Sequence, residues 1–312
     1  MNTIAEPTPA AFPNRVALYL AATRPPFLSV TFVGCLLGLA SAHFGGVPIR
    51  PLTALITVFF ALLAHAGVNV LNDYFDSQNG TDAANTERVF PFTGGSRFIQ
   101  NGVLTQRATG WFGFLLLAAV VPAGLWLAWL SGPALIGIGL LGLIVGWAYS
   151  APPFQLVSRG LGEIAITCAW VLVVVGTDFV QRHALSFTPL AAGLGFALLV
   201  ANVLYINQFP DMKADALAGK RTVVVRLGAS AARYGYGVLA AACGAWILAM
   251  VIDGALPLWA LLSLLPLGVS VGALRILWAN ASRPSGLAPA IKMTILAAVA
   301  HGAVLVGVLA FA

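Results

Sequence analysis

The chain of 312 residues is 60% hydrophobic and only 8% charged, and its mean hydropathy is +0.92. Because soluble domains carry about 25% charged residues, the composition excludes an ordinary soluble protein and indicates a polytopic membrane protein. The formal net charge of +6 does not favour nucleic acid as a partner, because the basic residues are spread over the loops. Lipid headgroups and an anionic substrate are better candidates.

Nine apolar runs are long enough to cross the hydrocarbon layer of about 30 Å as helices. They lie at residues 27–44, 51–71, 108–130, 133–150, 163–181, 189–209, 232–252, 257–279 and 288–311. We therefore predict an all-α membrane bundle of nine transmembrane helices. A polar tail would cover residues 1–26, and a single transmembrane domain residues 27–312.

The basic residues predict the topology, because cytoplasmic loops retain Lys and Arg. If the N-terminus is inside, fourteen Lys and Arg residues fall on one side of the membrane and two, Arg50 and Arg182, on the other. This asymmetry predicts a protein of the bacterial inner membrane with cytoplasmic N-terminus and motif loops, and with the C-terminus on the opposite side. The two longest connections, about 72–107 and 210–231, would both be cytoplasmic.

An Asn-x-x-x-Asp motif ends the second apolar run. Asn72, Asp73 and Asp76 are followed by Asp82, which gives four hard oxygen ligands within a short stretch of chain. Charged groups beside a membrane span are costly and therefore indicate function. Residues i and i+4 share a helix face, so Asn72 and Asp76 can converge on one ligand.

The same spacing recurs after the sixth run, in Asn207 and Asp211, and Asp215 follows four residues later. Pro210 would suit the start of a new short helix. Together the two motifs predict an oxygen-rich site for Mg²⁺ carrying a phosphate. Since the motifs lie four helices apart, a parallel four-plus-four repeat with an extra ninth helix would explain them.

Basic residues in the same two loops can neutralise phosphate charge on a leaving group. The candidates for diphosphate binding are Arg88, Arg97, Lys220 and Arg221. Each of them is also explained as a determinant of topology.

Several other reactive residues have no predicted role. Cys35, Cys168 and Cys243 lack metal-type spacing and are interpreted as small core residues. His65, His183 and His301 show no ligand spacing, and no partner is evident for Glu163 or Asp178.

The paired motifs after the second and sixth of nine helices resemble the UbiA superfamily of intramembrane prenyltransferases. This resemblance implies transfer of an isoprenoid chain from its diphosphate to an aromatic acceptor, with Mg²⁺ bridging the diphosphate and the acidic motifs. Many members read Asn-Asp-x-x-Asp-x-x-x-Asp, but here position 80 is Gly and the last acid is Asp82. With Gly94-Gly95-Ser96-Arg97 and Gly219-Lys220-Arg221-Thr222, this spacing is similar to the menaquinone branch, which prenylates 1,4-dihydroxy-2-naphthoate and releases CO₂.

The resemblance implies catalytic roles for Asp76, Asp211 and Tyr149, and an acceptor site formed by Asn69, Tyr149 and Ser150. Aromatic faces can stabilise an allylic cation, and the candidates are Tyr74, Tyr149 and Tyr205. Another acceptor, such as 4-hydroxybenzoate or homogentisate, remains an alternative. A secondary transporter is an alternative of a different class, since a repeat with acidic residues in a helical bundle fits that class too. No obligate protein partner is predicted.

Overall fold

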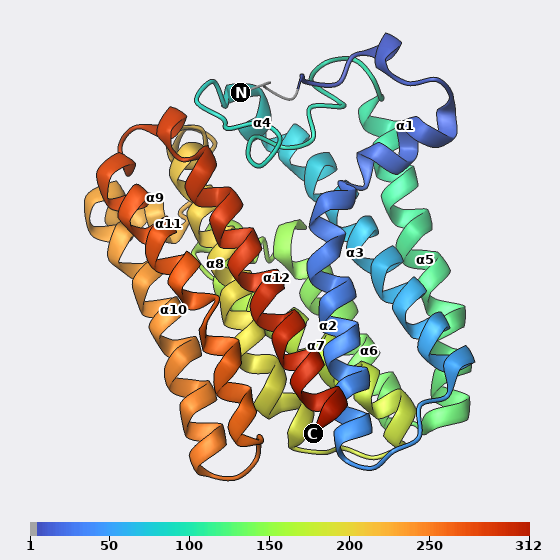
Figure 1. Cartoon of the computed structure of the whole chain (residues 1–312). Helices are drawn as coiled ribbons and strands as arrows, with labels where there is room; N and C mark the ends of the chain where they lie inside the picture. Colours follow the sequence, from blue (N-terminus) through green and yellow to red (C-terminus); the bar gives the residue numbers. More distant parts are fainter. Residues whose placement is uncertain (1–4) are drawn as a thin grey trace.

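Long helices dominate the computed structural model, which describes residues 5–312 (Figure 1). The α-helices are α1 (Arg15–Ala22), α2 (Pro25–Phe44), α3 (Pro51–Asn79), α4 (Thr81–Ala84), α5 (Gln106–Ser131), α6 (Ala134–Ser150), α7 (Gly162–Arg182), α8 (Thr188–Leu217), α9 (Val223–Leu227), α10 (Ala229–Ile252), α11 (Leu267–Asn280) and α12 (Ala288–Phe311). Short 3₁₀ segments lie at Pro9–Ala11, Leu156–Arg159, Leu258–Leu264 and Pro284–Gly286.

Eight helical stretches within the described residues are long and apolar enough to cross a membrane. They are α2, α3, α5, α7, α8, α10, the stretch Leu258–Asn280 that ends in α11, and α12. The remaining predicted run, 133–150, forms α6, an apolar helix of 17 residues that is shorter than the others. The all-α polytopic fold is confirmed, whereas the count of nine spans stays a prediction.

Helices α3 and α8 extend further than their apolar runs predicted. With 29 and 30 residues, they are roughly 44 and 45 Å long at 1.5 Å per residue, well beyond the hydrocarbon thickness. Both acidic motifs are therefore helical, and the connections begin only after Asn79 and Leu217. Pro210 lies inside α8 and does not start a new helix, because tertiary packing on both sides of the missing N–H holds one continuous helix.

The predicted polar tail also contains regular structure. Its residues 1–4 lie outside the described part, but residues 15–22 form α1, whose first turn is capped by the Asn14 side chain accepting from Ala17 N at 2.9 Å. The Tyr19 ring packs edge-on against Phe112 of α5, with 4.8 Å between centroids. Thus the N-terminal segment is anchored to the end of the bundle that carries the motifs.

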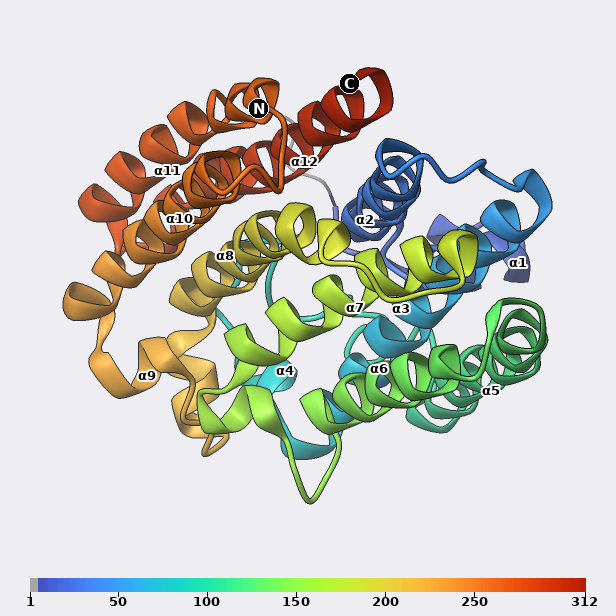
Figure 2. The same cartoon turned by 90° about the horizontal axis from the view of Figure 1, so that it is seen from below.

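Helix α8 occupies the centre of the bundle. It packs against α2, α7, α10 and α12, which surround it in the view along the helices (Figure 2). Small residues such as Ala191, Ala197 and Ala201 are fully buried on α8 and let its neighbours approach closely. Helices α3 and α8 carry their motifs at the same end and are parallel, as predicted, while the internal repeat itself stays a prediction.

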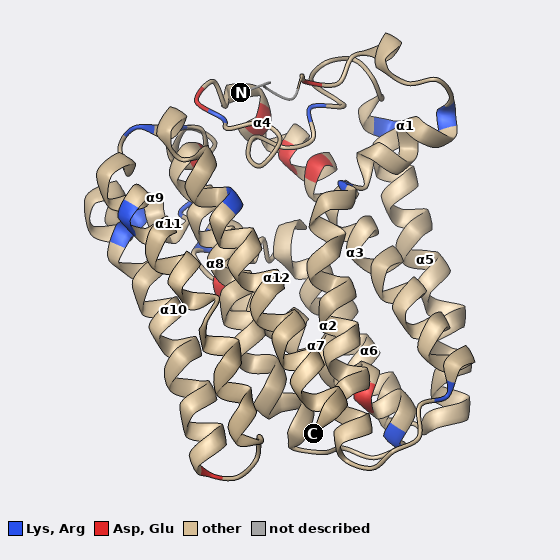
Figure 3. Cartoon of the chain, viewed as in Figure 1, with Lys and Arg blue, Asp and Glu red and all other residues tan. Residues whose placement is uncertain are grey.

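Charged residues are concentrated at that same end. Lys and Arg are spread over this end from α1 to α9 and α11, most of the acids also lie there, and few charged residues lie at the opposite end (Figure 3). The last helix, α12, ends at the opposite, sparsely charged end (Figure 1). The distribution matches the asymmetry expected from the sequence.

Candidate functional site

The first motif is held by contacts from three other parts of the chain. On α3, Asn72 Nδ2 donates to Asp76 Oδ2 at 3.2 Å and to Ser150 Oγ, at the end of α6, at 2.9 Å. Asp73 forms an ion pair with Arg24, just before α2, and accepts a hydrogen bond from the backbone N–H of Ser96 at 3.2 Å. The i, i+4 geometry predicted for Asn72 and Asp76 is therefore present.

The second motif meets the first at Lys220. The Lys220 ammonium lies 2.7 Å from Asp76 Oδ1 and 3.7 Å from Asp215 Oδ1, so one cation holds a carboxylate from each motif. Burial lowers the pKa of Lys220, but the two carboxylates outweigh burial and raise it. The lysine therefore stays charged at every physiological pH.

Asp211 and Asn207, the remaining members of the second motif, lie beside the connection between α4 and α5. Asn85 Nδ2 donates to Asp211 Oδ1, and Asn207 Nδ2 donates to the Phe92 carbonyl at 3.5 Å. The Oδ1 atoms of Asn85 and Asn207 are buried and have no hydrogen-bond partner among residues 5–312. Buried amide oxygens are normally satisfied, so these two acceptors are available to a ligand.

Asp82 is buried under a glycine. Its side chain is 3% exposed and accepts from Gln100 Nε2 at 3.4 Å. Burial, followed by repulsion from Asp76 and Asp73, raises its pKa well above the usual value. Gly95, at φ +73°, brings its backbone so close that a Cβ atom would overlap the Asp82 carboxylate, so this turn requires glycine.

The predicted diphosphate ligands are divided by the fold. Lys220 lies between the motifs, but Arg221 is exposed and touches Ser158 only through its backbone N–H. Arg88 and Arg97 face Glu6 of the N-terminal segment, with 2.5 Å from Arg88 Nη2 to Glu6 Oε1 and 3.7 Å from Arg97 Nε to Glu6 Oε2. Burial raises the pKa of Glu6, but hydrogen bonds from Asn101 and Arg88 outweigh it and lower the pKa.

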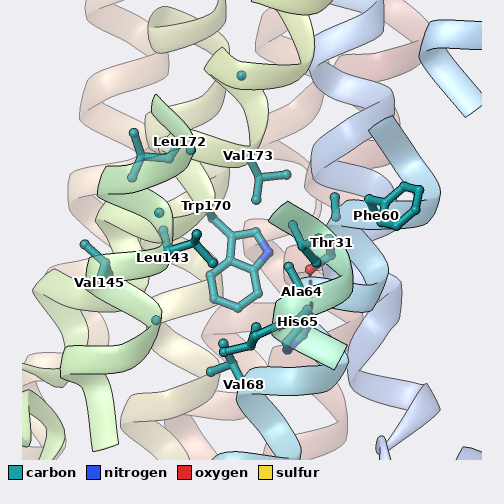
Figure 4. Close-up of a pocket in the computed structure, with 18 of the residues that line it drawn as sticks. Thr31, Phe60, Ala64, His65, Val68, Leu143, Val145, Trp170, Leu172 and Val173 are labelled. Carbon is teal, nitrogen blue, oxygen red and sulfur yellow. Dashed lines mark hydrogen bonds between the residues drawn. The ribbon is translucent and has the colours of Figure 1, made fainter. Parts of the chain in front are cut away.

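A cavity of about 460 Å³ opens from this end into the bundle. Arg24, Asn69, Asn72, Tyr149 and Asn207 line its polar part, and most of its remaining wall is apolar. The close-up shows how α2, α3, α6 and α7 contribute the deeper wall (Figure 4). This combination places polar side chains and one arginine at one end of an otherwise apolar chamber.

Among the predicted acceptor residues, Asn69 and Tyr149 line the cavity, and the Ser150 hydroxyl accepts a hydrogen bond from Asn72. Two of the three tyrosines expected to stabilise a cation point elsewhere. Tyr74 packs against Gly110 and Phe114 of α5, and the Tyr205 hydroxyl donates to the Ala232 carbonyl of α10 at 2.6 Å. Of the three, only Tyr149 lines the cavity and remains suited to that role. The sequence could not separate the three tyrosines, because an apolar run does not reveal which helix face each one occupies.

The donor chemistry fits Mg²⁺. Aspartate and asparagine oxygens are the hard ligands that this ion prefers, and the unpartnered oxygens of Asn85 and Asn207 add to them. Among the described residues no group of three or more His, Cys, Asp or Glu side chains is arranged as a metal cluster. Lys220 and Arg24 instead pair with the carboxylates.

Sequence reasoning missed several residues of the site. Arg24 was counted only as a determinant of topology, Glu6 was part of a polar tail, and Asn85 had no motif spacing. Their signal was the local excess of charged and amide side chains near the motifs, but only the fold shows which acid each one contacts.

The residues without a predicted role are mostly structural. Glu163 accepts from the Gln208 side chain, and Asp178 pairs with Arg182 on α7, 2.7 Å apart. Cys35 and Cys243 are buried as predicted, but Cys168 is exposed on α7, because an apolar run does not separate buried from lipid-facing positions. His65 is an exception, since it lines the cavity.

Comparison with curated sequences finds relatives over most of the chain. The 1,4-dihydroxy-2-naphthoate octaprenyltransferase of Mycobacterium tuberculosis is 32% identical over 261 residues, which is 83% of this chain and 85% of that protein. The protein of the same name from Haemophilus influenzae is 30% identical over 243 residues, 75% of each chain.

Solved structures share the fold. A UbiA homologue from Aeropyrum pernix K1 superposes with a TM-score of 0.64 at 18% identity, over 89% of this chain and 97% of that chain. A UbiA homologue from Archaeoglobus fulgidus bound to DMAPP and Mg²⁺ gives a TM-score of 0.61 at 19% identity, over 93% of this chain and 99% of that one.

The sequence profile of the UbiA prenyltransferase family matches residues 27–296. This match confirms the resemblance drawn from the two motifs, and it removes the transporter alternative. The chain is an integral membrane protein and belongs to the UbiA prenyltransferase family.

Proposed function

We propose that this protein transfers an isoprenoid chain from its diphosphate to 1,4-dihydroxy-2-naphthoate, with loss of the acceptor's carboxylate as CO₂. The observation that carries the proposal is the convergence of both acidic motifs on Lys220, while Asn72 and Asn207 of the same motifs line an apolar cavity. The names of the relatives in Mycobacterium tuberculosis and Haemophilus influenzae support the acceptor. The spacing of Asp76 and Asp82 supports the same branch.

Each part of the site has a role in this reaction. Lys220, with Arg88 and Arg97 once they are released from Glu6, would bind phosphate oxygens and stabilise the charge that develops on the departing diphosphate. Mg²⁺, held by Asp73, Asp76, Asp82, Asp211 and Asp215 with the amide oxygens of Asn72 and Asn207, would neutralise the same charge. Arg221 has no part in this assignment.

The apolar cavity would protect the reaction from water. As the C–O bond to diphosphate breaks, an allylic cation develops that water would otherwise capture. Tyr149, on the cavity wall, presents an aromatic ring that can stabilise the cation. The acceptor ring carbon forms the new C–C bond, and the C–C bond to its carboxylate then breaks and restores the aromatic ring.

The charge distribution supports an orientation for the protein. We assign the motif end of the bundle to the cytoplasmic side of a bacterial inner membrane, because Lys and Arg gather there. A soluble diphosphate headgroup and a polar acceptor would reach the site from the cytoplasm, while the isoprenoid tail stays among apolar side chains.

The test is product formation by the purified protein with Mg²⁺, an isoprenyl diphosphate and 1,4-dihydroxy-2-naphthoate, beside reactions with 4-hydroxybenzoate or homogentisate. A prenylated, decarboxylated product formed only with Mg²⁺ supports the proposal, whereas product from another acceptor alone overturns the branch. Asp76→Ala and Asp211→Ala should each abolish turnover without unfolding the bundle. Asp253→Asn, at an exposed position after α10, is the matched control and should remain fully active.

A further inference from the structure

Three polar side chains form a corner deep in the otherwise apolar part of the cavity. This polar corner consists of Thr31 on α2, His65 on α3 and Trp170 on α7, and all three line the cavity (Figure 4). The Thr31 hydroxyl and His65 Nδ1 are hydrogen-bonded at 2.8 Å. The His65 and Trp170 rings meet edge to face, with centroids 5.1 Å apart. The corner therefore has a defined geometry without any ligand.

The indole N–H of Trp170 is an unused donor. The side chain is 8% exposed, and Nε1 has no hydrogen-bond partner in the described chain. In Figure 4 this nitrogen lies on the side of the ring that faces Thr31. Since nearly all buried donors in proteins are satisfied, an unpaired buried N–H on a residue that lines a cavity points to an acceptor atom on a ligand.

Trp246 provides a direct comparison within the same protein. Its Nε1 donates to the Ala191 carbonyl at 2.8 Å, so this indole is satisfied by the protein. The two tryptophans differ in whether their N–H group has a hydrogen-bond partner among residues 5–312.

This step rests on the proposed function, which supplies two substrates whose chemistry can be compared. The isoprenoid tail is a hydrocarbon and has no atom that accepts a hydrogen bond. The aromatic acceptor carries hydroxyl and carboxylate oxygens. Of the two substrates, therefore, only the acceptor can satisfy the Trp170 N–H.

The position of the corner agrees with this identity. His65, Asn69, Asn72 and Asp76 follow one another at spacings of four, three and four residues and share one face of α3. Seven residues of helix place His65 roughly 10 Å below Asn72. An aromatic ring fits along this distance, between the polar corner and the end where the diphosphate would bind.

We propose that the polar corner is a subsite for the aromatic acceptor, in which Trp170 Nε1 donates a hydrogen bond to one acceptor oxygen. The Thr31 hydroxyl fixes the His65 ring, whose edge completes the subsite. An oxygen held here turns the opposite side of the acceptor ring toward the acidic motifs. Trp170 is thus a binding and positioning residue.

The test compares Trp170→Phe with Trp246→Phe in the purified full-length protein. Acceptor binding is measured by calorimetry without isoprenyl diphosphate, and the KM values for both substrates are measured separately. Trp170→Phe should weaken acceptor binding and raise the acceptor KM by about ten-fold or more, the loss of one hydrogen bond to a charged or polar oxygen. The KM for isoprenyl diphosphate should not change, and Trp246→Phe should leave both constants unchanged.

Acceptor analogues separate a hydrogen bond from packing. A set of acceptor analogues is used, each of which lacks one hydroxyl or the carboxylate. The analogue that lacks the oxygen bound by Trp170 should have the same affinity for the wild type and for Trp170→Phe. A uniform loss of affinity for every analogue, or no loss for any, would overturn the proposal. If Trp170→Phe does not fold, Thr31→Val decides in its place, with weaker acceptor binding expected and unchanged binding refuting the subsite.

Failure of the proposed function gives a different pattern. A wild-type protein that binds naphthoate through Trp170 but does not prenylate it would contradict the reaction and leave the subsite in place. If another acceptor binds instead, the same comparison is made with that compound. Absence of binding by every aromatic acceptor would refute the subsite.

Discussion

Replacing Lys220 with methionine removes a cation shared by the two motifs while keeping a side chain of similar length. At an effective dielectric constant of about 20, the attraction of its ammonium for Asp76 at 2.7 Å and for Asp215 at 3.7 Å corresponds to about 6 and 4–5 kcal/mol. Desolvation offsets part of this attraction, because Lys220 is only 6% exposed. Removing one partner of such a buried pair costs about 3–5 kcal/mol.

Two measurements follow from this magnitude. In metal-free detergent solution, the melting temperature of Lys220→Met should fall by roughly 5–10 °C. The kcat with saturating isoprenyl diphosphate should fall about 100- to 1000-fold, the usual effect of removing a donor that stabilises developing negative charge.

Lys213→Met is the matched control. Lys213 lies within the second motif, between Asp211 and Asp215, but its side chain is 67% exposed and pairs with Glu87 at the surface, where an ion pair contributes about 1 kcal/mol or less. It should leave melting temperature and kcat nearly unchanged. If Lys220→Met behaves like Lys213→Met in both assays, Lys220 does not join the two motifs.

Three further predictions concern the loops above the site. Because burial raises the pKa of Asp82 above its unfolded value, the wild type should lose stability as the pH rises from about 4 toward that folded pKa. The melting temperature of Asp82→Asn should equal that of the wild type near pH 4 and be higher near pH 8. A difference in melting temperature that is the same at both pH values would contradict the shift. Gly95→Ala should destabilise the protein by more than 1 kcal/mol and reduce kcat. Gly80→Ala should destabilise it less, because Gly80 also has a positive φ but has open space around it. Equal decreases in melting temperature for the two variants would refute the overlap with Asp82. Glu6→Gln should lower the KM for isoprenyl diphosphate several-fold, because it weakens a competing carboxylate at Arg88, and a raised KM would mean that Glu6 instead positions this arginine for catalysis.

The fold class could be predicted from the sequence because each span is specified locally. Runs of apolar residues determine a membrane helix without reference to the rest of the chain. Helix ends were less accessible, since α3 continues through a polar motif to Asn79 and α8 passes through Pro210. Both helices end close to a glycine with positive φ, Gly80 after α3 and Gly219 after α8. These local signals lie beyond the apolar runs from which the spans were predicted.

The site was predictable in its residue types but not in its pairings. The motifs singled out Asp73 and Asp211 as candidates, yet their partners, Arg24 and Asn85, lie outside any motif. The same limit explains the error at Tyr205, whose hydroxyl faces α10. A spacing rule reports which residues share a helix face, and only tertiary structure reports what that face contacts.

The central position of α8 has a consequence for how the protein is made. The second motif ends α8, but two of the contacts that orient this helix come from α10, which is synthesised later: Asn202 donates to the Tyr236 carbonyl at 3.0 Å, and Tyr205 donates to Ala232. A nascent chain that ends before α10 exposes these polar groups to lipid, where they lack partners. These contacts can therefore form only after α10 has been inserted, so α8 and the motif at its end reach their final arrangement late in synthesis.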